Sequence, residues 1–318
     1  MRLSAPHHRP QIDPRRPPPF PEDSDPSGKA TQNAFECLMK GNPLGPRTMA
    51  PEQDISVNTD GRALDFYLTS PSGLKPGERR PAVIVIHEIF GPDAHIRDVA
   101  RRFVGLGYVA AAPNLFTGEL HALLTPANIA LAMKAFSDAP PDLRRNPEKL
   151  AAFAASQPPE RRPILLAFGR LSSPPVQEGF VRELGAVARY LRSRPDVDPH
   201  RVASVGFCFG GAMSARLATV DPDLRAAVIF YGQNPPLDAV PRIGARVLGL
   251  YAEQDPGITQ TVPAFAQAMA AAGKSFEYHV YPGARHAFFN DTRPSFHKES
   301  AEDAWNRVGR FLADSFSQ

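Results

Sequence analysis

Short apolar runs alternate with amphipathic stretches along the chain, from about Asp54 to the C-terminus. The segment Ala82–Ile86 is a continuous, mostly β-branched run, which is typical of a strand buried on both faces of a sheet. In the stretch 298–315, apolar residues recur three and four positions apart, which indicates an amphipathic helix. This alternation predicts an α/β fold with a mostly parallel sheet flanked by helices.

The expected elements make one domain over residues 52–318. The first two strands, Ile55–Asn58 and Arg62–Thr69, form a hairpin whose turn is Asp60-Gly61. The other predicted strands are Ala82–Ile86, Tyr108–Ala112, Val202–Phe207, Ala226–Phe230, Val247–Tyr251 and Phe276–Tyr281. The predicted helices are Asp93–Leu106, Gln177–Arg192, 209–219, 261–272 and 298–315.

Residues 1–51 differ from the rest of the chain in composition. They hold eleven of the 35 prolines, including the run Pro17-Pro18-Pro19. A segment of this kind buries too little apolar surface to offset the entropy of ordering it. We expect a mobile arm here, with a short helix possible around 31–39, and we assign it no function.

Residues 117–175 interrupt the alternation of strands and helices. The segment shows no convincing strand, and Pro126–Phe136 and Glu148–Ala155 resemble short helices. An insertion that leaves the carboxyl end of a strand lies over the place where such sheets bind ligands. Two interpretations stay open: a helical lid over the carboxyl ends of the strands, or a packing excursion that touches no ligand.

Composition and charge exclude several classes of protein. The chain is 42% hydrophobic and 22% charged with a net charge of +3, and its arginines are scattered, so neither nucleic-acid nor membrane-surface binding is indicated. It has two cysteines, Cys37 and Cys208, no long apolar run and no apolar segment behind the N-terminal arginines. We therefore expect a cytoplasmic protein that keeps a free thiol, as a monomer or weak homodimer.

The strongest chemical signal is Gly206-Phe207-Cys208-Phe209-Gly210, followed by Gly211. An apolar strand leads into this motif and a helical stretch leads out of it, which is the context of a nucleophile elbow with Cys in the usual Ser position. The turn is tight enough that side chains two positions on either side would collide. The helix N-terminus after it favours a thiolate and an oxyanion. The alternative is that Cys208 is a small buried core residue.

An elbow predicts an acid and then a histidine, each just after a later strand. Asp255 follows the strand Val247–Tyr251, and His286 follows Phe276–Tyr281. Asp255 would orient the imidazole of His286, which takes the thiol proton. Glu253 is a less suitable acid, because the position before Pro256 fits better. The other histidines show no metal-ligand spacing, and we expect no metal and no cofactor.

Three segments resemble the dienelactone hydrolase family: VIVIHEIFG (83–91), VGFCFGG (205–211) and YPGARHAFFN (281–290). The resemblance covers roughly residues 54–316. It implies a single α/β-hydrolase domain with a Cys-His-Asp triad that cleaves esters or lactones without metal or organic cofactor. The type reaction of the family is the opening of an enol-lactone ring, as carboxymethylenebutenolidase.

The resemblance also assigns roles to residues after the first buried strand. Glu88 is similar to the family carboxylate that contacts the nucleophilic Cys, whereas the alternative is a loop carboxylate paired with a nearby arginine such as Arg97. The backbone N–H groups of Ile89 and Phe209 correspond to the oxyanion hole.

The chain departs from the family at one substrate-binding position. Asn290 stands where characterised family enzymes have an Arg that holds the substrate carboxylate, and neither Arg285 nor Arg293 matches that Arg by position. We expect a cysteine hydrolase acting on a small-molecule lactone or ester. A broader carboxylesterase or thioesterase is the second hypothesis, and a non-catalytic binding protein of the same fold is the third.

Overall fold

The computed structural model describes residues 52–59, 61–137, 139, 143 and 146–318. The predicted N-terminal arm, the possible helix within it and Cys37 all lie outside the described residues.

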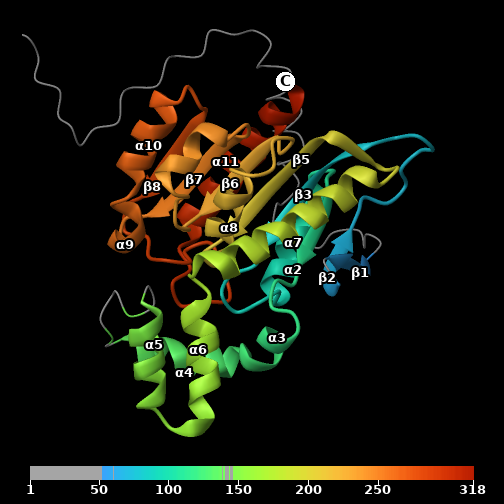
Figure 1. Ribbon diagram of the computed structural model, residues 1–318. Coiled ribbons are helices and arrows are strands. Elements are labelled where there is room, and N and C mark those ends of the chain that lie inside the picture. Colours follow the sequence, from blue (N-terminus) through green and yellow to red (C-terminus); the bar gives the residue numbers. More distant parts are fainter. Residues whose placement is uncertain (1–51, 60, 138, 140–142, 144–145) are drawn as a thin grey trace, which may run out of the picture.

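One mixed sheet runs through the domain in the order β1-β2-β4-β3-β5-β6-β7-β8 (Figure 1). Strands β1 and β2 form the predicted antiparallel hairpin, and β2 pairs antiparallel with β4. All remaining neighbours are parallel, as predicted. The strands are β1 (Glu52–Thr59), β2 (Arg62–Thr69), β3 (Arg80–Ile86), β4 (Val109–Pro113), β5 (Val197–Phe207), β6 (Ala226–Phe230), β7 (Arg246–Ala252) and β8 (Phe276–Tyr281).

Helices cover both faces of this sheet. The pleat of β3 sends Val83 and Val85 to one face and Ile84 and Ile86 to the other, and all four are fully buried. The first face packs against α2 (Ala94–Gly105) and α11 (Lys298–Ser317). The second packs against α7 (Pro174–Ser193), α8 (Phe209–Leu217) and α10 (Val262–Ala271). The continuous apolar run in the sequence therefore reflects burial from both sides.

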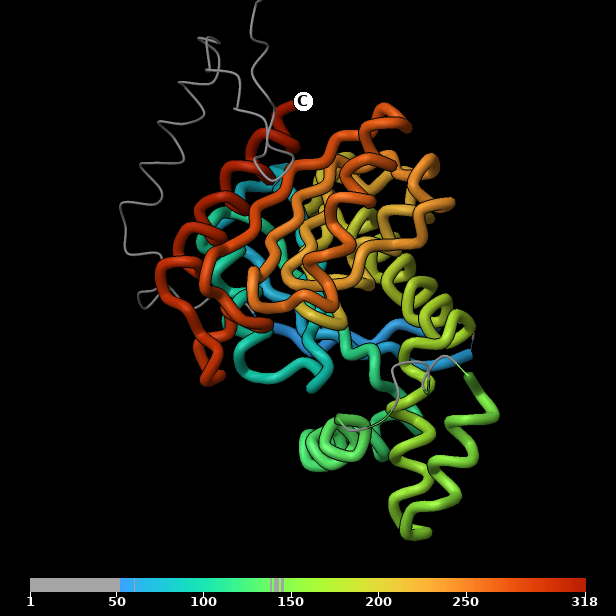
Figure 2. The backbone as a smooth tube through the Cα atoms, turned by 90° about the vertical axis from the view of Figure 1, so that its left-hand side faces the viewer, coloured from blue at the N-terminus to red at the C-terminus, as the bar shows by residue number. Residues whose placement is uncertain are grey.

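A separate group of helices interrupts the α/β layers between β4 and α7. Figures 1 and 2 show this group beyond one end of the sheet, away from α10 and α11. It consists of α3 (Glu119–Leu123), α4 (Pro126–Ser137), α5 (Pro147–Ala155), the short 3₁₀ helix η2 (Pro159–Arg161) and α6 (Arg162–Arg170). We call α3–α6 the roof. Helices α4 and α5 match the sequence prediction, whereas α3 and α6 were not predicted.

The roof has an apolar core of its own. Phe136 of α4 lies 5.2 Å from Phe153 of α5 and 5.7 Å from Phe168 of α6, ring centroid to ring centroid. Helices α5 and α6 approach so closely that a Cβ on Gly169 would lie 2.5 Å from Leu150 Cδ1. Aromatic and aliphatic packing thus holds these short helices together.

Candidate active site

Cys208 lies at the sharp turn between β5 and α8, as the motif predicts. Its backbone has φ 55° and ψ −112°, outside the ordinary regions for a residue with a side chain. A Cβ on Gly206 would lie 1.9 Å from the Gly210 carbonyl oxygen, and one on Gly210 would lie 2.3 Å from that of Ile86. The two glycines are therefore required by backbone contact, and the strain at Cys208 presents its side chain at the end of the sheet.

His286 and Asp255 meet across two neighbouring loops at this end of the sheet. The Nδ1 atom of His286 lies 2.5 Å from Asp255 Oδ2. Two backbone bonds join the loops: Glu253 N–H donates to the Tyr281 carbonyl at 3.1 Å and Gln254 N–H to that of Ala284 at 2.9 Å. Residue order and geometry thus agree: the acid and histidine that follow β7 and β8 are in contact.

The environment of His286 favours the imidazolium. Burial by itself would lower the pKa of His286, but hydrogen bonds to Asp255 and Cys208, together with the charges of both groups, raise it to about 10. The ring of Tyr231 packs edge-on against the imidazole at 5.2 Å between centroids. The arrangement can hold a proton on His286 beside the sulfur of Cys208.

Glu253 has a different role from Asp255. Its Oε2 atom accepts a hydrogen bond from the Gly283 amide at 2.8 Å, at the start of the loop that carries His286. Glu253 therefore braces this loop, while Asp255 contacts the ring itself.

Glu88 is buried beside the elbow in a cluster of neutral donors. The Tyr231 hydroxyl donates to Glu88 Oε1 at 3.2 Å, and Asn290 Nδ2 donates to Oε2 at 2.8 Å. Arg97 instead contacts Asp54 at 3.3 Å and lies over the Tyr67 ring, so the alternative pairing of Glu88 with Arg97 is wrong. Asn290, which stands where family enzymes have an Arg, is fully buried, and its side chain contacts a protein carboxylate.

The amides of Ile89 and Phe209 flank the thiol. Both residues line one cavity with Cys208 and His286. Neither backbone N–H has a hydrogen-bond partner among the described residues. Phe209 is the first residue of α8, where helix N–H groups have no partner within the helix. Two unpaired donors in the cavity that the thiol also lines can bind a developing oxyanion.

The roof forms one side of this cavity. The cavity measures about 380 Å³ and lies between Cys208 and His286 on one side and the helices of the roof on the other. The roof and the start of α7 contribute the side chains of Met133, Phe136, Ser137, Phe168, Leu171, Ser172 and Gln177. Most of this lining is apolar. The insertion therefore lies over the carboxyl ends of the strands and borders the expected site.

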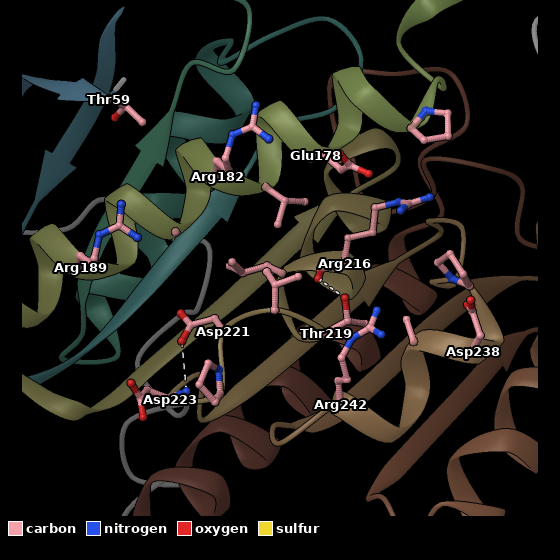
Figure 3. Close-up of a pocket in the computed structure, with 18 of the residues that line it drawn as sticks. Thr59, Glu178, Arg182, Arg189, Arg216, Thr219, Asp221, Asp223, Asp238 and Arg242 are labelled. Atoms are coloured by element: carbon pink, nitrogen blue, oxygen red, sulfur yellow. Dashed lines mark hydrogen bonds between the residues drawn. The ribbon is translucent and has the colours of Figure 1, made fainter. Parts of the chain in front are cut away.

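A larger groove elsewhere on the molecule lacks these features. It measures about 950 Å³ and lies along α7, α8 and the 3₁₀ helix η3 (Leu237–Arg242). Both arginines and carboxylates line it (Figure 3). Arg192 pairs there with Asp221 at 3.0 Å. None of the expected catalytic residues lines this groove, so size alone does not identify the site.

His87 has a structural role. Its Nε2 atom accepts the Leu115 amide at 3.1 Å, and Nδ1 lies 2.6 Å from the Glu88 carbonyl. Burial lowers the pKa of His87 to about 4, which keeps the ring neutral. Among the described residues, no three His, Cys, Asp or Glu side chains are grouped to hold a metal ion. Within the same part of the chain, no helix has the length and apolarity needed to cross a membrane.

Tyr231 and Gln177 were missed by the sequence prediction. Tyr231 directly follows β6 with φ 38°, and its ring and hydroxyl contact His286 and Glu88. Gln177 lies in the buried stripe of α7. A signal for Gln177 was present, because a polar residue in an otherwise apolar helical stripe is unusual. Nothing in the sequence marked Tyr231.

Comparison with known proteins gives one consistent result. The model of the dienelactone hydrolase family matches residues 64–316. A protein named "Putative carboxymethylenebutenolidase" from Saccharolobus solfataricus is 36% identical, over 82% of this chain and 98% of its own length. A protein of the same name from Salmonella typhi is 34% identical, over 81% of this chain and 85% of its own.

Solved structures agree with the sequence matches. The crystal structure titled "Putative Dienelactone Hydrolase" from Klebsiella pneumoniae is 30% identical with a TM-score of 0.62, covering 84% of this chain and 99% of that one. The region matched by the family model includes most of β2, all of β3–β8, the turn at Cys208 and both loops that follow β7 and β8. The chain therefore belongs to the dienelactone hydrolase family and is an ester- or lactone-hydrolysing enzyme of the α/β-hydrolase fold.

Proposed function

We propose that the chain is a cofactor-independent cysteine hydrolase in which Cys208, His286 and Asp255 form the catalytic triad. The observation that carries the proposal is the 2.5 Å contact of His286 with Asp255 below a cavity that Cys208 also lines. The substrate is a small carboxylic ester or lactone, as in the relatives named carboxymethylenebutenolidase.

The first half-reaction transfers the acyl group to sulfur. His286 takes the Cys208 proton, and the sulfur attacks the carbonyl carbon while the carbonyl electron pair moves to oxygen. The amides of Ile89 and Phe209 hold this oxyanion, and Asp255 stabilises the imidazolium. The intermediate then collapses, the carbon–oxygen ester bond breaks, and His286 protonates the departing alkoxide. In a lactone that alkoxide stays attached to the acyl chain.

Water completes turnover in the second half-reaction. Neutral His286 removes a proton from the water, whose oxygen attacks the thioester carbonyl. Collapse of the second intermediate breaks the carbon–sulfur bond, releases the acid and returns the proton to Cys208. The two protein groups that exchange protons and form bonds in these steps, Cys208 and His286, both line the cavity.

Glu88 acts beside the sulfur in this proposal. Its carboxylate is buried next to the elbow, and two neutral donors hold it. Glu88 is similar to the family carboxylate that contacts the nucleophilic Cys, and the Tyr231 hydroxyl that donates to it belongs to the ring that packs against His286. We therefore assign Glu88 to control of thiolate formation.

A broader carboxylesterase or thioesterase activity is the second candidate. It is favoured by Asn290, which donates to Glu88 and so is not placed to bind a substrate carboxylate. The mostly apolar cavity lining suits neutral acyl chains.

Hydrolysis of a dienelactone and of p-nitrophenyl acetate by wild type, Cys208→Ala and Cys208→Ser tests both candidates. We expect Cys208→Ala to lose at least about a thousandfold in kcat while its melting temperature stays the same. Turnover of the lactone identifies the type reaction, and turnover of only the simple ester identifies the esterase. Full activity of Cys208→Ala contradicts the mechanism. Inertness of Cys208 to thiol reagents would instead favour a non-catalytic binding protein.

A further inference from the structure

Helix α7 carries one polar side chain in its buried stripe. The buried residues of this helix are Gln177, Phe180, Val181, Leu184, Val187, Ala188 and Leu191. Their spacing of three and four places them on one face. Phe180 lies 5.4 Å from the ring of Phe209, directly after the nucleophile. Gln177, one turn before Phe180, reaches the catalytic cavity and lines it.

The side-chain oxygen of Gln177 has no hydrogen-bond partner among the described residues. The residue is only 7% exposed, and its Oε1 atom is buried with no hydrogen bond to any described residue. An unpaired buried amide destabilises a fold, whereas an apolar side chain of similar size would pack in the stripe without that cost. The amide therefore costs stability in the empty protein, and a bound molecule that hydrogen-bonds it would remove that cost.

The surroundings of Gln177 restrict what such a molecule can be. Phe136, Phe168 and Leu171 border the same cavity, so the body of the ligand is apolar. The buried oxygen requires a donor, while the NH₂ of the same amide donates. A hydroxyl or amide group can satisfy both ends. A carboxylate has acceptors only.

We propose that Gln177 determines specificity by hydrogen-bonding a hydroxyl or amide group on an otherwise apolar, neutral ester or lactone. The inference rests on the proposed hydrolytic function and names its substrate class. Substrates that lack the polar group leave the Gln177 amide unpaired in the transition state as well as in the empty site. They are therefore turned over more slowly.

The test compares esters that differ only in one polar group. The reference substrate is p-nitrophenyl hexanoate. Three further esters carry one hydroxyl on the acyl chain, near the carbonyl, midway along the chain or at its end. A fifth ester carries a terminal carboxylate instead. For wild type we expect kcat/KM to be about tenfold higher for at least one hydroxylated ester than for hexanoate. In Gln177→Leu this preference disappears because kcat/KM for the hydroxylated ester falls to that for hexanoate, and the melting temperature does not fall.

Matched variants separate recognition from folding. Glu178→Gln changes the next residue on α7, which faces the groove of Figure 3, and should keep the wild-type preference. Gln177→Met supplies an unbranched apolar side chain of similar length should the leucine not pack.

Three results would overturn the inference: equal rates on all esters, a preference that survives in both Gln177 variants, or a wild-type preference for the carboxylated ester. The proposed function fails by a different result, namely hydrolysis that survives Cys208→Ala.

Discussion

The floor and the roof of the catalytic cavity are built by different forces. The floor consists of the loops after β3, β5, β6, β7 and β8. Polar contacts fix these loops, among them His286–Asp255 and Glu88–Asn290, and Cys208 and Tyr231 hold positive φ. The roof is held by contacts such as Phe136–Phe168 and Leu150–Gly169. Hydrogen bonds require fixed distances and angles, whereas apolar packing tolerates exchange of side chains of similar volume.

This difference separates chemistry from selectivity. Proton transfer and oxyanion binding require atoms placed within a few tenths of an ångström, and in the mechanism that we propose the floor supplies these atoms. We infer that the roof and the first turn of α7, which line the cavity, select the shape and polarity of the substrate body. A change in the floor should therefore reduce the rate on every substrate, while a change in the roof should redistribute rates among substrates.

The largest effect is expected from Asp255→Asn in the floor. The amide cannot stabilise the imidazolium of His286, so kcat should fall by about a thousandfold or more on every ester. The pKa of His286 should also fall from its raised value of about 10. The rate of Cys208 alkylation as a function of pH reports that change, because the thiolate is stabilised by the imidazolium.

Glu253→Gln is the matched control for Asp255→Asn. The new side chain keeps an acceptor for the Gly283 amide, and we expect a loss below about tenfold. A larger loss in Glu253→Gln than in Asp255→Asn would reverse the assignment of the two carboxylates.

An intermediate effect is expected from Phe136→Ala in the roof. Removing this ring enlarges the cavity above Cys208, so the ratio of kcat/KM for long over short acyl chains should rise about tenfold. Alkylation of Cys208 should keep its wild-type rate, because the floor is unchanged. Rates on a series of p-nitrophenyl esters of increasing chain length measure the ratio.

Phe153→Ala is the control for the roof. Phe153 packs against Phe136 at 5.2 Å but does not line the cavity. Its loss weakens the roof without reshaping the cavity wall, so the chain-length ratio should stay near that of wild type. A similar change of ratio in both variants would show that roof stability, and not cavity shape, sets the selectivity.

The same division explains what the sequence could predict. Gly206 and Gly210 are required by backbone contacts. The order of Cys208, Asp255 and His286 follows from the order of the strands that precede them. Both features appear in the sequence as short local patterns, so residues of the floor could be predicted. The prediction of a mostly parallel sheet is confirmed for the same reason: burial on both faces leaves continuous apolar runs.

Only part of the roof, helices α4 and α5, could be predicted from the sequence. Helix α6 begins at Arg162-Pro163, and a sequence of this kind resembles a loop. The burial of its apolar residues depends on packing against other helices of the roof, such as the contact of Phe168 with Phe136 of α4. The contact of Tyr231 with Glu88 joins residues 143 positions apart, and no local pattern marks such a pair. The sequence identified Asn290 as a departure from the family, but only the structure shows that Asn290 hydrogen-bonds Glu88.

The smallest effect is expected in α7, the helix that joins roof and floor. Glu183 lies on this helix between the buried residues Val181 and Leu184. Burial raises the pKa of its carboxyl to about 7, although the charges of Arg62 and Arg182 act to lower it. The unfolded chain, with a pKa near 4.5, releases its proton first as pH rises. Stability is therefore lost between about pH 4.5 and pH 7, and the loss is complete above pH 7.

Glu183→Gln removes this titration. At pH 8 the variant should be more stable by about 1 kcal/mol, a figure reduced for the partial solvent exposure of the group, or about 2–4 °C in melting temperature. At pH 5 the two proteins should differ far less. Ester hydrolysis should be unchanged, because Glu183 does not line the catalytic cavity. Thermal unfolding of both proteins at pH 5 and pH 8 tests this prediction. An equal change in melting temperature at the two pH values would mean that Glu183 affects packing and not proton binding.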